Sequence, residues 1–373
     1  MHFELLHFEL APAARAGKIT PQMKAALSAI LLLAALAGTA SGGVNRLQRA
    51  SISGSDYVRV GEWADDAGLA MVWNKGEESI ELTNQSASIR LATDSRNARK
   101  SQICGVNVWL SLPVVQRGGV PWISLADVQT TLQPVLFPQK SRTPVQTICL
   151  DPGHGGTDKG EVASDYFEKK YALLLAQAAE KLLRAEGFKV ILTRTNDVYV
   201  DLSDRPARAA RAGADLFVSL HYNSGPQPLH GVEVHCLPPA GMKSSNAGGG
   251  RGGDPAYPGN AQDSRNILLA YEVLKSIRAL PLDDIGVKRE HYMVLKEARI
   301  PAILIEGGFM TDPQDAKKIY DPEFRQRMAR SIVNGILAYK KAVEESVPPP
   351  VPPPAGNLQV RSPARPPPAP GRD

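Results

Sequence analysis

The sequence predicts an α/β protein: an open, twisted, mostly parallel sheet flanked by helices, preceded by a small β-rich domain. Three observations support this prediction. Apolar β-type runs alternate with amphipathic helical stretches over residues 146–344, which is the pattern of βαβ units. Residues 50–140 instead hold short β-type runs separated by turn signals. The 373 residues suffice for two domains and terminal segments.

The first segment, residues 1–42, has the pattern of an export signal. Lys24 precedes an apolar run at 25–37, and small residues follow up to Ser41. A basic start, a short apolar run and a small-residue cleavage zone are typical of a secretory signal. The run is short for a membrane span. We therefore expect an exported protein of the periplasm or cell envelope, with an uncleaved membrane anchor as the alternative.

The β-rich domain contains five short runs of strand-like composition before a short helix at 125–132. The runs are residues 57–60, 69–73, 79–83, 88–91 and 106–112. This domain resembles the small N-terminal domain of copper amine oxidases, but no histidine occurs over residues 43–153 to bind copper. It supplies no candidate site residue, so we expect it to be dispensable for chemistry.

The domain at 146–344 is predicted to alternate strands with amphipathic helices. The strands are 147–150, 188–193, 215–220, 232–237 and 302–305, and the helices are 168–186, 203–212, 266–280 and 322–343. The Gly-rich stretch 238–262 disfavours a helix, so we expect a mobile flap beside the substrate groove, with a plain surface insertion as the alternative. The tail, 345–373, is Pro-rich and predicted to be disordered or polyproline-like. The tail and the β-rich domain are the candidate places for a protein partner.

Composition excludes some functions. The net charge is only +5, and no segment interleaves basic and aromatic residues, so no nucleic-acid partner is expected. A mildly basic surface suits an anionic polymer such as a cell wall. The sequence has no G-x-S-x-G motif, which disfavours a serine hydrolase. Its three cysteines match no CxxC pattern of zinc or redox sites.

Four side chains of metal-site type occur in the α/β domain. His154, His221 and Glu306 each follow an apolar β-run, and Glu168 opens the first long helix. Ligands bind outside the carboxyl ends of the strands of such a sheet. Two imidazoles and a carboxylate form a zinc site with an open fourth position, and a further carboxylate can act as a base. The pattern therefore predicts a Zn²⁺ hydrolase.

Each of these residues also has a structural interpretation. Glu168 fits a helix-capping role equally well, and Glu161 is a competing ligand. A histidine at a strand end is often satisfied by backbone groups, and a lone acid such as Glu306 is often structural. Three further histidines are less favoured as ligands: His230, His235 and His291.

A resemblance to a known family rests on several stretches that occur in the family's order. These are 150–156 (LDPGHGG), Glu168, 219–223 (SLHYN), 231–234 (GVEV), 286–288 (GVK) and 305–309 (IEGGF). Together they resemble the zinc-dependent N-acetylmuramoyl-L-alanine amidases of the Amidase_3 type, over about residues 146–340. Tyr222 departs from the alanine more common at its position, which puts the shape of the pocket in doubt.

The resemblance implies that His154, Glu168 and His221 are the zinc ligands and that Glu306 is the catalytic glutamate. It thereby favours Glu168 over Glu161. It implies peptidoglycan as the substrate, cut at the amide between N-acetylmuramic acid and L-alanine. Two alternatives are a zinc peptidase that cuts stem peptides and a non-catalytic wall-binding protein. A non-catalytic wall-binding protein should lack one of the zinc ligands or the glutamate at the end of the last strand, Glu306. All four residues are present.

Overall fold

The computed structural model describes residues 47–94 and 98–345, which belong to one compact unit, Val44–Asp373. The expected export signal at 1–42 and nearly all of the Pro-rich tail lie outside the described residues. Among the helices of the described part, none is long and apolar enough to cross a membrane.

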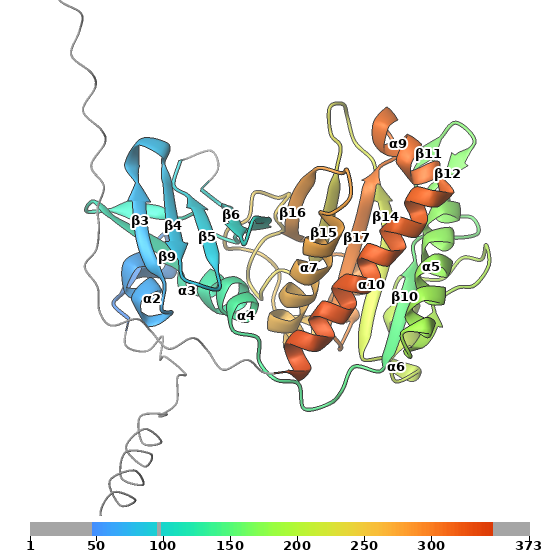
Figure 1. Cartoon of the computed structure of the whole chain (residues 1–373), viewed down its shortest axis with the longest axis horizontal. Coiled ribbons are helices and arrows are strands. Elements are labelled where there is room, and N and C mark those ends of the chain that lie inside the picture. The colour runs from blue at the N-terminus through green and yellow to red at the C-terminus, as the bar shows by residue number, and fades with distance from the viewer. Residues whose placement is uncertain (1–46, 95–97, 346–373) are drawn as a thin grey trace, which may run out of the picture. The chain divides into compact units, whose positions relative to one another are not determined.

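One eleven-stranded sheet organises the structure, with the order β13-β10-β14-β17-β15-β16-β7-β6-β5-β4-β3 (Figure 1). The strands of its α/β half, residues 147–309, are β10 (Thr147–Pro152), β13 (Lys189–Leu192), β14 (Leu216–Asn223), β15 (Val232–Cys236), β16 (Asp284–Arg289) and β17 (Ala302–Phe309). Of their pairings only β15 with β17 is antiparallel. The prediction of a mostly parallel sheet flanked by helices is therefore confirmed for this half.

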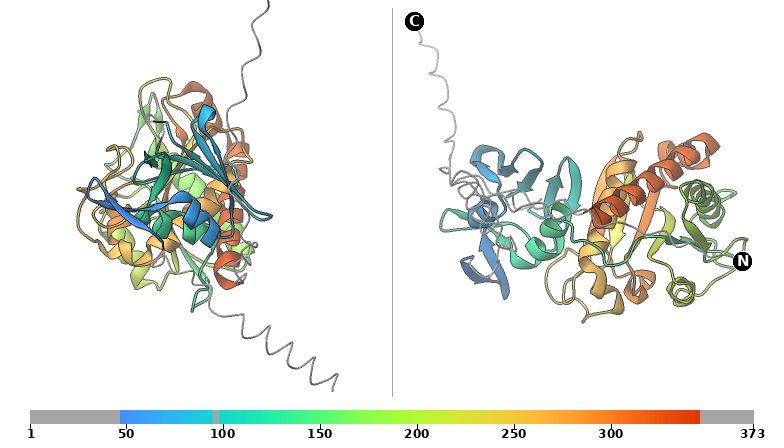
Figure 2. Two further views of the ribbon diagram at one scale, coloured as in Figure 1. Left: turned by 90° about the vertical axis from the view of Figure 1, so that its left-hand side faces the viewer. Right: turned by 60° about the horizontal axis from the view of Figure 1, so that its bottom comes forward.

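Helices cover the two faces of the sheet unequally. Three long helices lie side by side over one face (Figure 1): α5 (Glu168–Ala185), α7 (Asp263–Ile277) and α10 (Pro322–Glu344). Figure 2 shows the molecule from two further directions. Alternate strand residues such as Ile303 and Ile305 pack beneath them. The opposite face packs on short helices, α6 (Asp204–Arg211) and α8 (Met293–Glu297). The second face is therefore the more open one. A further helix, α9 (Pro313–Tyr320), follows β17.

The β-rich region contributes to the same large sheet. Its strands β3 (Ala70–Asn74), β4 (Ser79–Thr83), β5 (Ser88–Ala92), β6 (Lys100–Ile103) and β7 (Val106–Trp109) continue the order past β16. A four-stranded sheet completes the region, from β1 (Arg49–Ile52), β2 (Ser55–Arg59), β9 (Val120–Ser124) and β8 (Val115–Arg117). Its helical segments are α2 (Val60–Asp66), η2 (Lys75–Glu77), α3 (Leu125–Asp127), η3 (Val128–Leu132) and α4 (Gln133–Leu136).

The junction between the two regions is held by specific contacts. Asn107 donates its backbone N–H to Asp284 Oδ2 (3.0 Å), and Trp109 Nε1 donates to the carbonyl of Ile285 (3.0 Å). One hydrophobic core runs through both regions. The β-rich region supplies none of the four candidate site residues, yet its removal would expose the edge of β16 and part of this core. Dispensability for chemistry therefore does not imply that the α/β half folds alone.

The Gly-rich stretch 238–262 is anchored by hydrogen bonds to the β-rich region and to β16, and its mobility stays a prediction. Gly250 donates its N–H to the carbonyl of Ser111 (2.8 Å), and Arg99 Nη2 donates to the carbonyl of Ser245 (3.2 Å). Ser245 in turn donates its N–H to the carbonyl of Arg289 (2.8 Å). The stretch ends in a short helical turn, η4 (Pro258–Gln262). It therefore bridges the β-rich region and the end of β16.

Candidate metal centre

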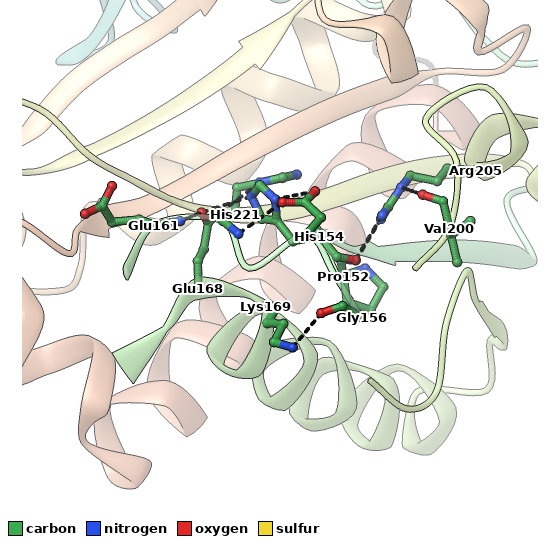
Figure 3. Close-up of polar contacts among 12 residues, drawn as sticks. Pro152, His154, Gly156, Glu161, Glu168, Lys169, Val200, Arg205 and His221 are labelled. Atoms are coloured by element: carbon green, nitrogen blue, oxygen red, sulfur yellow. Dashed lines mark hydrogen bonds and ion pairs between the residues drawn. The ribbon is translucent and has the colours of Figure 1, made fainter. Parts of the chain in front are cut away.

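Three of the four candidate residues lie together at the carboxyl edge of the parallel strands. One potential ligand atom from each of His154, Glu168 and His221 lies within 4.8 Å of the others. Figure 3 shows Glu168 between the two histidines. Its Oε2 is 2.9 Å from His154 Nε2, and its Oε1 is 2.9 Å from His221 Nδ1. No other group of this kind occurs among the residues that the structure describes.

The backbone of the turn after β10 brings the ligands together. His154 adopts a left-handed conformation with φ of 59°, which is uncommon outside glycine and directs its ring toward the site. A Cβ at Gly153 would overlap the His221 ring, and a Cβ at Gly160 would overlap Glu168 Oε2. Glycine is therefore required at these two positions by close approach.

The carboxylate of Glu168 is held in its charged form. It is buried, and burial alone would raise its pKa. The two histidine rings outweigh burial and hold the pKa of Glu168 well below its usual range. Backbone N–H groups of Glu161 (2.9 Å) and Tyr222 (3.1 Å) also donate to it. An ionised carboxylate between two imidazoles is a donor set that suits Zn²⁺.

Outer contacts orient the first histidine. His154 Nδ1 lies 2.9 Å from Asp158 Oδ2. A carboxylate on the second ring nitrogen is the usual support of a metal-binding histidine, because it leaves the other nitrogen's lone pair for the metal. Burial opposes protonation of His154, but Glu168 and Asp158 outweigh it and raise its pKa.

A buried arginine, Arg205, also holds the turn after β10 in place. Arg205 donates to the carbonyls of Pro152 (2.9 Å), His154 (2.9 Å) and Val200 (3.1 Å) (Figure 3). Its charge is balanced by Asp151, which lies 2.9 Å away and is fully buried. The guanidinium therefore fixes three backbone carbonyls around the site at once.

Glu306 lies beside this centre on the next strand. It is the register partner of His221 across β14 and β17, so both side chains leave the sheet on its more open face. It is 8% exposed, and its Oε2 has no hydrogen-bond partner among the described residues. Burial first, and then the charges of Glu168 and Glu233, raise its pKa well above the usual value. These are properties of a general base.

The remaining candidates lie elsewhere. The side chain of Glu161 is not in the metal-type group, and His230 bonds to Asp283 Oδ2 (2.9 Å) on the surface. His291 bonds to Ser244 (3.0 Å), and His235 lies 3.0 Å from Glu233 Oε2. Tyr222 packs in the core beneath the long helices, so this departure from the family pattern leaves the open face unchanged.

Several polar residues of the site escaped the sequence analysis. Asp158 follows His154 by four residues, but a surface acid in a Gly-rich turn gives no signal of its own. Glu233 is the register partner of Glu306, and its Oε1 forms an ion pair with Lys288 Nζ (2.7 Å). The stretches that contain Glu233 and Lys288 contributed to the family resemblance without an assigned role.

Comparison with known proteins identifies the family of the chain. The family described as N-acetylmuramoyl-L-alanine amidase, Amidase_3, matches residues 148–338. The chain is 32% identical to YqiI of Bacillus subtilis over 223 residues, 58% of this chain and 97% of that protein. It is 31% identical to the probable cell wall amidase LytH of Staphylococcus aureus, over 64% of this chain and 73% of that protein.

Two further similarities cover different shares of the chains. The N-acetylmuramoyl-L-alanine amidase LytC of Bacillus subtilis is 27% identical over 79% of this chain, which spans 52% of LytC. A crystal structure of an N-acetylmuramoyl-L-alanine amidase from Clostridium difficile 630 is 30% identical, with a TM-score of 0.45, over 54% of this chain and 99% of that one.

Proposed function

Because the chain belongs to the Amidase_3 family and is an N-acetylmuramoyl-L-alanine amidase, we propose that its reaction uses Zn²⁺ held by His154, Glu168 and His221, with Glu306 as the base. The bond cleaved is the amide between N-acetylmuramic acid and L-alanine in peptidoglycan. The observation that carries the proposal is the convergence of two imidazoles and one carboxylate within 4.8 Å, beside a buried glutamate.

The residues present fit a zinc ion. Zinc takes nitrogen, sulfur and carboxylate ligands in tetrahedral sites, and a catalytic site keeps one position open. A magnesium site would need oxygen ligands throughout, which the two histidines exclude. When bound, zinc polarises a carbonyl oxygen and lowers the pKa of water to about 7.

Glu306 supplies the proton transfers in this scheme. With its raised pKa it takes a proton from the attacking water, and it then delivers that proton to the alanine nitrogen as the amide breaks. The side chains of His154 and His221 are 21% and 19% exposed, so a substrate can reach the metal centre from solvent.

A combined experiment tests metal and base. Wild-type protein purified without added metal should contain about one zinc per chain and should release free stem peptides from purified muropeptides, detected by mass spectrometry. His154→Ala with His221→Ala should abolish both zinc and activity. Glu306→Gln should keep zinc and lose roughly 10²–10⁴-fold in activity.

Three outcomes would contradict parts of this scheme. Full zinc content in the double histidine variant would remove the site. Wild-type turnover in Glu306→Gln would remove the base. Cleavage between amino acids of the stem peptide, with the muramoyl amide intact, would favour a zinc peptidase.

An envelope location is also part of the proposal. Peptidoglycan lies outside the cytoplasmic membrane, and residues 23–41 have the pattern of an export signal. N-terminal sequencing of the protein recovered from the cell envelope should give a start near residues 38–42. The β-rich region and the Pro-rich tail remain the proposed places for a protein partner.

A further inference from the structure

Two of the stretches that carry the family resemblance, 231–234 and 286–288, have no assigned role. They lie next to each other, beside Glu306. The stretch 231–234 carries Glu233 on β15, and 286–288 carries Lys288 on β16. Lys288 Nζ lies 2.7 Å from Glu233 Oε1. This ion pair joins side chains 55 positions apart in the sequence. It lies beside Glu306, the register partner of Glu233.

Strand register places this pair in line with the catalytic residues. His221 is the partner of Glu306, Glu306 the partner of Glu233, and Glu233 the partner of Gly286, two residues before Lys288. Register partners and residues two apart share a face of a sheet. A polar row therefore crosses four adjacent strands on the open face, from the metal centre to Lys288.

The far end of this row is positively charged and within reach of solvent. The side chain of Lys288 is 12% exposed and lies 5.7 Å from the centre of the Trp109 ring. Arg99 (5.5 Å) and Lys100 (5.4 Å) lie over the same ring. An ammonium has three donors; Glu233 and, at 3.4 Å, Asn246 Oδ1 account for two of those of Lys288.

We propose that Lys288 is a specificity-determining residue that binds the free carboxylate of the second stem-peptide residue, with Glu233 holding the ammonium in place. This deepens the proposed function and rests on it. Two strand spacings separate the backbones of β17 and β16, about 10 Å, and the lysine side chain reaches back across one of them to Glu233. In an extended peptide the second residue lies roughly 7 Å beyond the scissile carbonyl. A substrate anchored at Glu306 therefore brings that carboxylate toward Lys288.

The chemistry of the substrate supplies a matched pair of probes. In stem peptides the second residue is D-glutamate joined through its γ-carboxyl, so its α-carboxylate is free, or is amidated as D-isoglutamine. N-acetylmuramoyl-L-alanyl-D-glutamate and N-acetylmuramoyl-L-alanyl-D-isoglutamine therefore differ only at the α-carboxyl group of the second residue, which is a carboxylate in the first probe and an amide in the second. A charge-assisted hydrogen bond predicts that wild-type kcat/KM is about 10–100-fold higher for the carboxylate.

The experiment measures the ratio of kcat/KM for these two probes. Lys288→Met should reduce the preference to about one, and Lys288→Arg should keep it. In Lys288→Met the Glu233 carboxylate loses its lysine and keeps only His235. The double variant Glu233→Gln with Lys288→Met removes that carboxylate as well, and it should also show no preference. Lys275→Met is a matched control, because Lys275 lies on α7 over the opposite face; it should leave the ratio unchanged.

The unmodified protein provides a second measurement that does not depend on variants folding. Added salt screens an ionic contact, so it should lower kcat/KM for the carboxylate probe more than for the amide probe. Equal preference for the two probes in wild type, or an unchanged ratio in Lys288→Met, would overturn the assignment. Failure of wild type to release the dipeptide from either probe and from intact muropeptides would instead contradict the amidase function.

Discussion

At the scale of the residue, the site depends on the carboxyl group of Glu306, whose surroundings disfavour its ionised form. Glu306 is buried between register partners, and one of them, Glu233, is itself acidic. Burial and the nearby negative charges favour the protonated form and raise its pKa. Since a general base must be ionised, activity should be lost as the pH falls through this raised pKa. The acid limb of the pH profile therefore lies above the range of an ordinary glutamate.

Glu233→Gln should move this limb to lower pH. Removal of a neighbouring negative charge favours the ionised form of Glu306, so its pKa falls, although burial keeps it above the ordinary value. The measurement is kcat/KM against pH for wild type and variant, with zinc content confirmed. Glu180→Gln, a change at a partly exposed residue on α5, is the control and should leave the limb in place. If the acid limb of Glu233→Gln is unchanged or moves to higher pH, Glu233 does not raise the pKa of Glu306.

The sequence predicted the four candidate residues, because each follows an apolar run or opens a helix. It did not predict their support. Asp158 and Arg205 act through contacts with the His154 turn, and the Glu233–Lys288 pair depends on strand register. Such contacts become visible only when strands distant in sequence are aligned.

At the scale of the element, segments with a clear periodic pattern were predictable and segments without one were not. The predicted helix at 168–186 is observed as Glu168–Ala185, and the predicted strand at 79–83 as Ser79–Thr83. The five-residue helix α8 and the strand β16, which contains Gly286, gave no periodic signal. A pattern this short contains too few residues to distinguish a helix from a strand.

The turn after β10 yields a prediction about an element. Gly153→Ala should weaken zinc binding by roughly 10–100-fold, as changes in the support of metal ligands commonly do, because the added methyl group would displace the His221 ring. Zinc retained after dialysis against a chelator of known affinity measures this. Gly76→Ala is the matched control, since its Cβ would meet nothing within 4 Å and its φ is not positive. Equal zinc retention in both variants would show that the turn tolerates a side chain.

At the scale of the whole molecule, the two regions expected from the sequence share one sheet and one hydrophobic core. A hydrogen bond between β7 and β16 joins residues separated by 177 positions, which no local pattern indicates. Arg289, fully buried, adds a second connection. It donates to the carbonyls of Leu237 (3.0 Å) and Thr130 (2.6 Å) and to Thr131 Oγ1 (3.0 Å). It therefore ties the helical segment after β9 to the end of β15.

These connections predict that both regions unfold together. All four tryptophans, Trp63, Trp73, Trp109 and Trp122, lie in the β-rich region, whereas the long helices belong to the α/β half. Tryptophan fluorescence and helical circular dichroism therefore report on different regions, and their urea transitions should coincide.

Arg289→Met should shift both transitions to lower urea together. It leaves two buried acceptors and one partly buried acceptor without this donor, at a cost of roughly 1–3 kcal/mol for each unsatisfied buried group when the structure does not relax. Arg330→Met is the control: its ion pair with Glu186 is half exposed, and such pairs contribute about 0–1 kcal/mol. Separate fluorescence and dichroism transitions in the wild type would show that the β-rich region is an independent unit despite the shared sheet. A shift of the fluorescence transition alone in Arg289→Met would confine that arginine's role to the β-rich side.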